Sequence, residues 1–180
     1  GAYRLNAHYY LGVAAYEKKD AVTALSHFDK VLEYPHNKYS EEATTMAAEL
    51  AYNSKDYTRA LTLYKLLKGK TTSADRLLMA RTGILRSAHL SGDGAEVIAA
   101  ATELLADNKT APELANEARY YRSRAAAKAG NRELAGKDLE ELAKDTRHLY
   151  GAEAKYRLAE MHYSAKDYAD AEKVLLNYIE

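Results

Sequence analysis

Several side chains of this chain could do chemistry, but their spacing does not favour it. None of the six histidines belongs to a pair at metal-ligand spacing with a supporting carboxylate pattern: His8, His27, His36, His89, His148 and His162. Adjacent acids such as Glu41-Glu42 are typical of solvated helix surfaces, and there is no glycine-rich phosphate loop or nucleophile elbow. With no cysteine, disulfides and thiolate catalysis are excluded. We therefore predict no catalytic residue, no metal, no cofactor and no enzymatic activity.

Tyrosine is the side chain whose abundance points to a function. The chain has 16 Tyr, one Phe and no Trp. Tyrosine packs like an apolar ring yet keeps a hydroxyl that binds water, so this composition suits a protein-binding surface. The same rings could instead fill gaps between neighbouring helices. The sequence leaves both interpretations open at any single position.

Charge and hydropathy exclude two classes of partner. Lys plus Arg and Asp plus Glu are equal at 26 each, so no overall field attracts nucleic acid or an anionic membrane. No run approaches the roughly 18 apolar residues of a membrane span. We predict neither nucleic-acid binding nor direct membrane insertion. Any electrostatic preference must be local.

A repeated pair of residue types organises the chain. A small residue recurs at Ala7, Ala43, Ala80, Ala118 and Ala154. Thirteen positions after each alanine stands an Asx residue, at Asp20, Asp56, Asp93, Asn131 and Asp167. Successive Asx residues are 36, 37, 38 and 36 positions apart, so the extra residues fall between the units. Helical periodicity on both sides of each Asx predicts an all-α solenoid of about five helical hairpins, one domain over residues 1–180.

Local signals place the ends of these helices. An Asx side chain can accept hydrogen bonds from the first backbone N–H groups of the next helix, which explains its return at each turn. Pro35 cannot sit inside a helix and predicts an exit loop after the first hairpin. Ser40 is placed to cap the third helix, and Gly69 to end the fourth.

This pattern resembles the tetratricopeptide repeat family. The resemblance covers essentially the whole chain and rests on Leu11-Gly12, Ala24, Phe28 and Pro35 in the first copy, and on Lys55-Asp56-Tyr57, Ala60 and Tyr64 in the second. It implies a right-handed α-α superhelix with a concave groove lined by the first helix of each hairpin. The third and fourth copies depart from the family pattern at Leu85, Gly94 and Arg122. The long joints look like those of bacterial envelope members, which implies a periplasmic or outer-membrane-associated location.

The resemblance also implies which residues form a partner-binding groove. These are Tyr9, Tyr16, Glu49, Tyr52, Arg86, His89, Tyr120, Arg124, Lys128, Tyr156, Glu160 and Tyr163. The middle of this series is basic, so the expected partner is an acidic segment or terminal carboxylate of another protein. Pairing of Glu49 with Arg86, and of Arg124 with Glu160, would account for the same charges without a partner.

Three classes of function follow. The first is a non-enzymatic scaffold that holds a segment of a partner protein in the groove. The others are a structural spacer of a larger cell-envelope protein and an accessory domain of an enzyme encoded elsewhere. A chain that starts at Gly1 rather than methionine and stops abruptly at Glu180 is expected to be part of a longer protein. Its last helix should expose an apolar stripe and support end-to-end self-association, through Val174, Leu175, Tyr178 and Ile179.

Overall fold

The computed structural model describes residues 2–34 and 36–179, with side chains over 3–34 and 36–176. These ranges contain ten α-helices and no strand, which confirms the predicted all-α repeat fold. The chain divides into two compact units, Gly1–Gly92 and Asp93–Glu180, called here the N-terminal and C-terminal units. Within the described residues, no helix combines the length and apolar character needed to cross a bilayer.

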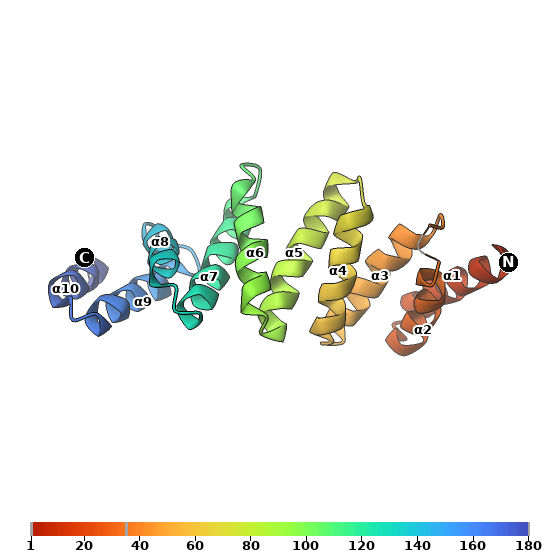
Figure 1. Cartoon of the computed structure of the whole chain (residues 1–180), viewed down its shortest axis with the longest axis horizontal. Helices are drawn as coiled ribbons and strands as arrows, with labels where there is room; N and C mark the ends of the chain where they lie inside the picture. Colours follow the sequence, from red (N-terminus) through yellow and green to blue (C-terminus); the bar gives the residue numbers. More distant parts are fainter. Residues whose placement is uncertain (1, 35, 180) are drawn as a thin grey trace. The chain divides into compact units, whose positions relative to one another are not determined.

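The N-terminal unit contains five helices, each packed against the one before it (Figure 1). They are α1 (Ala2–Glu17), α2 (Ala21–Leu32), α3 (Ser40–Asn53), α4 (Tyr57–Lys70) and α5 (Ala74–Ser91). Phe28, Leu67 and Leu85 are completely buried and form its interior. Pro35 lies outside the described residues. Apolar stripes along successive helices thus merge into one core, which no isolated hairpin could bury.

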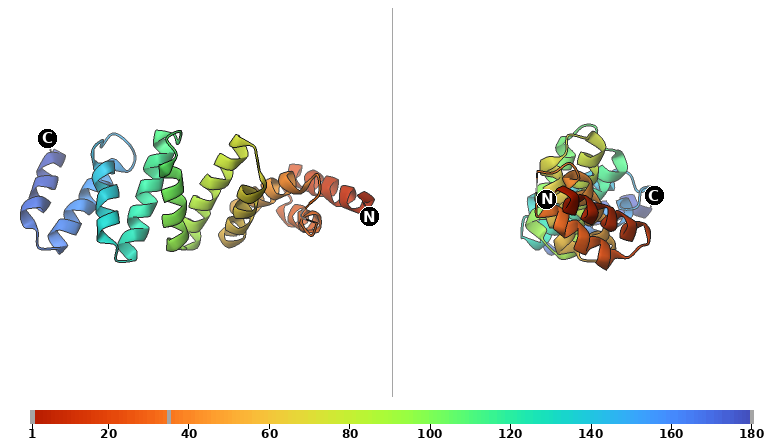
Figure 2. Two further views of the ribbon diagram at one scale, coloured as in Figure 1. Left: turned by 45° about the horizontal axis from the view of Figure 1, so that its top comes forward. Right: turned by 90° about the vertical axis from the view of Figure 1, so that its right-hand side faces the viewer.

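The C-terminal unit also consists of helices that each pack against the next, from green α6 to blue α10 in Figure 2. Its helices are α6 (Gly94–Ala106), α7 (Pro112–Lys128), α8 (Arg132–Ala143), α9 (Gly151–Ser164) and α10 (Tyr168–Ile179). An apolar cluster joins α7, α8 and α9 through Tyr120, Leu139, Leu142, Ala154 and Leu158. Two of these helices, α8 and α9, also contribute to the floor of the cavity described below.

The Asx residues occupy the turns that the repeat predicts. Four of them accept a hydrogen bond from the backbone N–H three positions later, each at 3.1 Å: Asp20, Asp56, Asp93 and Asn131. Asp167 directly precedes α10, and its carbonyl accepts from the N–H of Ala171 at 3.1 Å. The residue before the Asx has a left-handed backbone in every copy, for example φ 64° at Lys55 and φ 81° at Gly92. Short-range chemistry therefore sets every hairpin turn.

We expect Asp56→Ala to lower the free energy of unfolding by about 1 kcal/mol, because it removes an acceptor for an otherwise unpaired N–H group of α4. Asp56→Asn should cost no more than a few tenths of that, since Asn131 makes the same contact in the fourth copy. Urea denaturation followed by circular dichroism measures both. Equal losses for the two variants would contradict the capping role.

Two predicted helix ends are wrong. Tyr39, not Ser40, is the N-cap of α3, and its side chain makes no capping hydrogen bond. Ser40 is already inside α3 and buried, where its hydroxyl accepts a hydrogen bond from Lys70 Nζ. The helix α4 continues past Gly69 to Lys70 and ends at the extended residue Thr71. For Ser40, the contact with α4 takes the place of the capping that its residue type favours, whereas the end of α4 is closed locally by the Thr71 N–H on the Leu67 carbonyl.

Candidate partner-binding surface

Two of the predicted groove tyrosines pack inside their units. Tyr9 is only 7% exposed and its ring stacks on Tyr39, with centroids 4.1 Å apart and an interplanar angle of 14°. Tyr120 is equally buried and stacks on Tyr150 at 4.5 Å and 19°. Burial, together with a hydrogen bond to Glu42, raises the pKa of Tyr9 to about 12. These two rings therefore fill gaps between helices, because each is covered by a tyrosine 30 positions later, in the loop between two hairpins.

Four other predicted residues of the N-terminal unit lie in two pairs. The Tyr16 hydroxyl of α1 donates a hydrogen bond to Glu49 Oε2 of α3 at 3.0 Å. Burial and this bond raise the pKa of Tyr16. Tyr52 and the exposed Arg86 line a shared hollow of about 400 Å³ beside α5. His89 is half-buried one turn beyond Arg86 on α5 and does not line that hollow.

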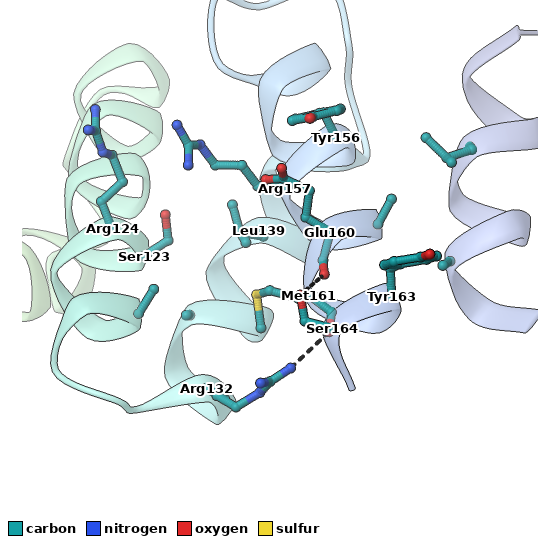
Figure 3. A pocket seen from close by; sticks show the side chains of 15 residues that line it. Ser123, Arg124, Arg132, Leu139, Tyr156, Arg157, Glu160, Met161, Tyr163 and Ser164 are labelled. Atoms are coloured by element: carbon teal, nitrogen blue, oxygen red, sulfur yellow. Dashed lines mark hydrogen bonds between the residues drawn. The ribbon is translucent and has the colours of Figure 1, made fainter. Parts of the chain in front are cut away.

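The C-terminal unit brings four predicted residues around one larger cavity of about 660 Å³ (Figure 3). Arg124 reaches it from α7, whereas Tyr156, Glu160 and Tyr163 reach it from α9. Lys128, one turn beyond Arg124 on α7, is exposed but does not line the cavity. We call this hollow and its rim the α7–α10 cavity.

The floor of the α7–α10 cavity is apolar. It is formed by buried side chains of α8, α9 and α10, namely Ala135, Leu139, Ala159 and Ala171. Three of the four are alanines, so the helices that carry them leave a hollow between their backbones instead of filling it with side chains. The half-exposed Leu175 adds an apolar wall from α10. An apolar side chain of a ligand would be removed from water here.

The rim contains a cation that takes part in none of the ion pairs found among the described residues. Arg124 is exposed, and its guanidinium lies 5.6 Å from the centroid of the Tyr120 ring. Its Nη1 also donates a long hydrogen bond of 3.4 Å to the Tyr120 hydroxyl. Among the described residues Arg124 makes no ion pair, so the pairing with Glu160 that was the alternative to partner binding is not found. Glu160 instead accepts a hydrogen bond from the Tyr156 hydroxyl, which raises the pKa of Tyr156.

Two further arginines of the rim were missed by the sequence argument. Arg157 pairs with Glu153 one turn earlier on α9 at 2.7 Å, and this contact holds the pKa of Glu153 below its usual range. Arg132 of α8 donates a hydrogen bond to the Met161 carbonyl of α9 at 2.8 Å (Figure 3). The Glu-to-Arg spacing of four could have indicated the first contact. No local signal indicates the second, because it joins residues 29 positions apart.

The aromatic residues of the rim remain open to solvent. Tyr156 is 58% exposed and Tyr163 is 65% exposed, with the Tyr163 ring edge-on to Tyr168 at 5.2 Å. Along α10, Leu175 and Leu176 are also exposed and border a second, apolar hollow of about 300 Å³. Tyr178 and Ile179, predicted to extend this stripe, lie outside the described side chains. The C-terminal unit thus presents aromatic rings, an exposed guanidinium and an apolar floor on one surface.

Comparison with known proteins supports the repeat family and the fold. Residues 124–180 match a family model of the tetratricopeptide repeat. The crystal structure of the MamA protein superposes with a TM-score of 0.69 at 16% identity, covering 99% of this chain and 92% of that one. The nearly identical TPR-like repeats of a candidate kinesin light chain from Podosopora anserina give 0.59 at 15% identity, covering 97% and 93%. At such identities the likeness shows the fold alone. No curated protein sequence matches this chain.

Proposed function

We propose that this chain is a non-enzymatic scaffold that binds an acidic segment of a partner protein at the α7–α10 cavity. Folds built of stacked helical hairpins are commonly protein–protein interaction scaffolds. The observation that carries the proposal is Arg124, an exposed guanidinium that forms no ion pair among the described residues and lies at the edge of an apolar hollow. It is the kind of group that recognises a carboxylate by charge-assisted hydrogen bonds.

The chemistry of the surface specifies what the segment must contain. A Glu or Asp side chain, or a terminal carboxylate, would pair with Arg124. A neighbouring apolar side chain would enter the hollow against Leu139 and Leu175, while Tyr156 and Tyr163 pack beside the peptide. A volume of about 660 Å³ holds a few side chains but no folded element. The ligand is therefore a short peptide, extended or with a single turn, that has an acidic residue next to an apolar one.

The test is a selection of peptides from a random library on the wild-type chain, followed by titration of the selected peptides against variants. We expect the selected sequences to combine Asp or Glu with an aliphatic or aromatic neighbour. Arg124→Glu should weaken their binding at least about tenfold, since a charge-assisted hydrogen bond contributes about 1.5–3 kcal/mol. Fluorescence anisotropy of labelled peptides gives the affinities, and circular dichroism confirms that the variant is folded.

Lys128→Glu is the matched control. It makes the same change of charge on the same helix, one turn away, at an exposed position that does not line the cavity. We expect an effect below about threefold, because an exposed charge that makes no direct contact with the ligand contributes little to binding. Equal losses of affinity in both variants would show that only the overall charge of the surface matters. Full binding by folded Arg124→Glu would refute the α7–α10 cavity as the site.

A further inference from the structure

The turn between α9 and α10 gathers three side chains that ligate metals. His162 comes from the end of α9, Asp167 from the turn and Asp170 from the first turn of α10. One ligand atom of each, an imidazole nitrogen or a carboxylate oxygen, lies within 4.8 Å of the other two. His162 Nδ1 is 3.7 Å from Asp167 Oδ2, too far for a hydrogen bond. The imidazole is half-buried and both carboxylates are exposed.

The backbone of this turn explains why the three positions meet. The N–H of Asp167 donates to the carbonyl of His162 at 2.9 Å, across the left-handed residue Lys166 with φ 64°. The same closure from the Asx to the residue five positions earlier recurs at Asp20, Asp56 and Asn131, at 2.8 to 2.9 Å. Each of these turns therefore brings that earlier residue beside the helix cap.

Only the fifth copy places an imidazole there. The equivalent residues of the other four copies are alanines, all of them buried: Ala15, Ala51, Ala88 and Ala126. Three positions after the Asx, the other copies have Thr23, Arg59, Glu96 and Leu134, where the fifth has Asp170. Helix capping accounts for an Asp at the cap and an acid in the first turn. It does not account for a histidine at a position that is otherwise alanine.

We infer that His162, Asp167 and Asp170 form a binding site for a divalent transition-metal ion, with Zn²⁺ as the expected occupant. One imidazole nitrogen and two carboxylate oxygens are ligands that Zn²⁺ accepts, and water would complete a tetrahedral shell. Ca²⁺ requires six to eight oxygen ligands and Mg²⁺ an octahedral oxygen shell, so neither fits this donor set as well. The bound ion would clamp α9 to α10 next to Tyr163. This site is independent of the peptide-binding proposal.

The test is calorimetric titration of Zn²⁺ into the tag-free chain, together with thermal unfolding with and without the ion. We expect one saturable ion per chain at this site and a higher unfolding temperature with Zn²⁺, because an ion that binds only the folded state stabilises it. Two variants remove ligands while copying residues that the chain uses elsewhere. His162→Ala restores the alanine of the other copies, and Asp167→Asn introduces the residue type that the fourth copy has at Asn131, where it caps the next helix. Each should weaken Zn²⁺ binding at least about tenfold in a folded protein.

A pair of histidines elsewhere in the chain makes a control necessary. His8 of α1 and His27 of α2 have their Nδ1 atoms 3.0 Å apart, and such a pair could also hold Zn²⁺. His27→Leu, which copies Leu63 of the second copy, removes that pair. It should leave the thermal shift and the His162-dependent binding unchanged. Absence of saturable binding, or binding that survives His162→Ala but is lost in His27→Leu, would overturn the proposal.

Discussion

Replacing Arg122 with alanine is expected to destabilise the C-terminal unit by about 3–5 kcal/mol, the usual loss when one member of a buried ion pair is removed. The guanidinium makes two parallel hydrogen bonds to Asp138, Nε to Oδ2 and Nη2 to Oδ1, each 2.8 Å long. The two side chains are only 15% and 4% exposed. Nη1 also donates to Thr102 Oγ1 at 2.9 Å, so the residue links α7 to α6 and α8. Without it, Asp138 would stay buried with no cation beside it.

A double variant separates the ion pair from simple packing. In the third copy the same two positions are Ile84 and Ala100, both buried. Arg122→Ile combined with Asp138→Ala should therefore be nearly neutral, since apolar replacement of a whole buried pair is often tolerated. Urea denaturation followed by circular dichroism gives both free energies. A double variant that loses as much as Arg122→Ala would show that the pair itself is not the cause.

Gly83→Ala is expected to destabilise the N-terminal unit by about 1–3 kcal/mol. A Cβ at Gly83 of α5 would lie 2.5 to 2.6 Å from three ring carbons of Tyr64 on α4. This ring is 6% exposed, and its burial raises the pKa of Tyr64 to about 12. Inside a helix, alanine normally gains about 1 kcal/mol over glycine. We expect the overlap to outweigh that gain, because distances below 3.0 Å are too short for a Cβ contact and force the ring or the helix to shift.

Gly69→Ala is the matched control on α4. Gly69 is exposed, and nothing lies within 4 Å of a Cβ built there. Here the helix preference acts alone, and we expect a gain of about 0.5–1 kcal/mol. Thermal and urea unfolding of the two variants should therefore shift in opposite directions. A stabilised Gly83→Ala variant would contradict the close contact between α5 and the Tyr64 ring.

The hairpin repeat could be predicted because its signals are local. An Asx side chain reaches an N–H group only three positions away, so its recurrence at Asp20, Asp56, Asp93 and Asn131 marks a turn whatever surrounds it. Gly12 was likewise interpretable as a site of close approach, and a Cβ there would lie 2.7 Å from the Phe28 ring. Ser40 failed because a buried contact with Lys70 took the place of the capping that its residue type favours.

The division of the tyrosines between core and surface could not be predicted. Tyr9, Tyr120 and Tyr156 hold the same position of their copies, eleven residues before the Asx. Tyr9 and Tyr120 are each covered by a stacked tyrosine from the loop before the next hairpin, whereas Tyr156 is 58% exposed beside the α7–α10 cavity. Which role a ring takes depends on whether another segment covers it, and periodicity within one helix carries no such information.

The sequence by itself determined the helices, their turns and the absence of an overall charge, because each depends on neighbouring residues or on composition. Only the tertiary structure decided which side chains meet across helices. It joined Arg122 to Asp138, placed Arg124 over the Tyr120 ring with no ion pair among the described residues, and placed His162 beside Asp167 and Asp170. Most of these residues stand at positions whose residue type differs from copy to copy, so the repeat pattern does not single them out. Their partners are chosen by the packing of the neighbouring helix, which depends on many residues at once.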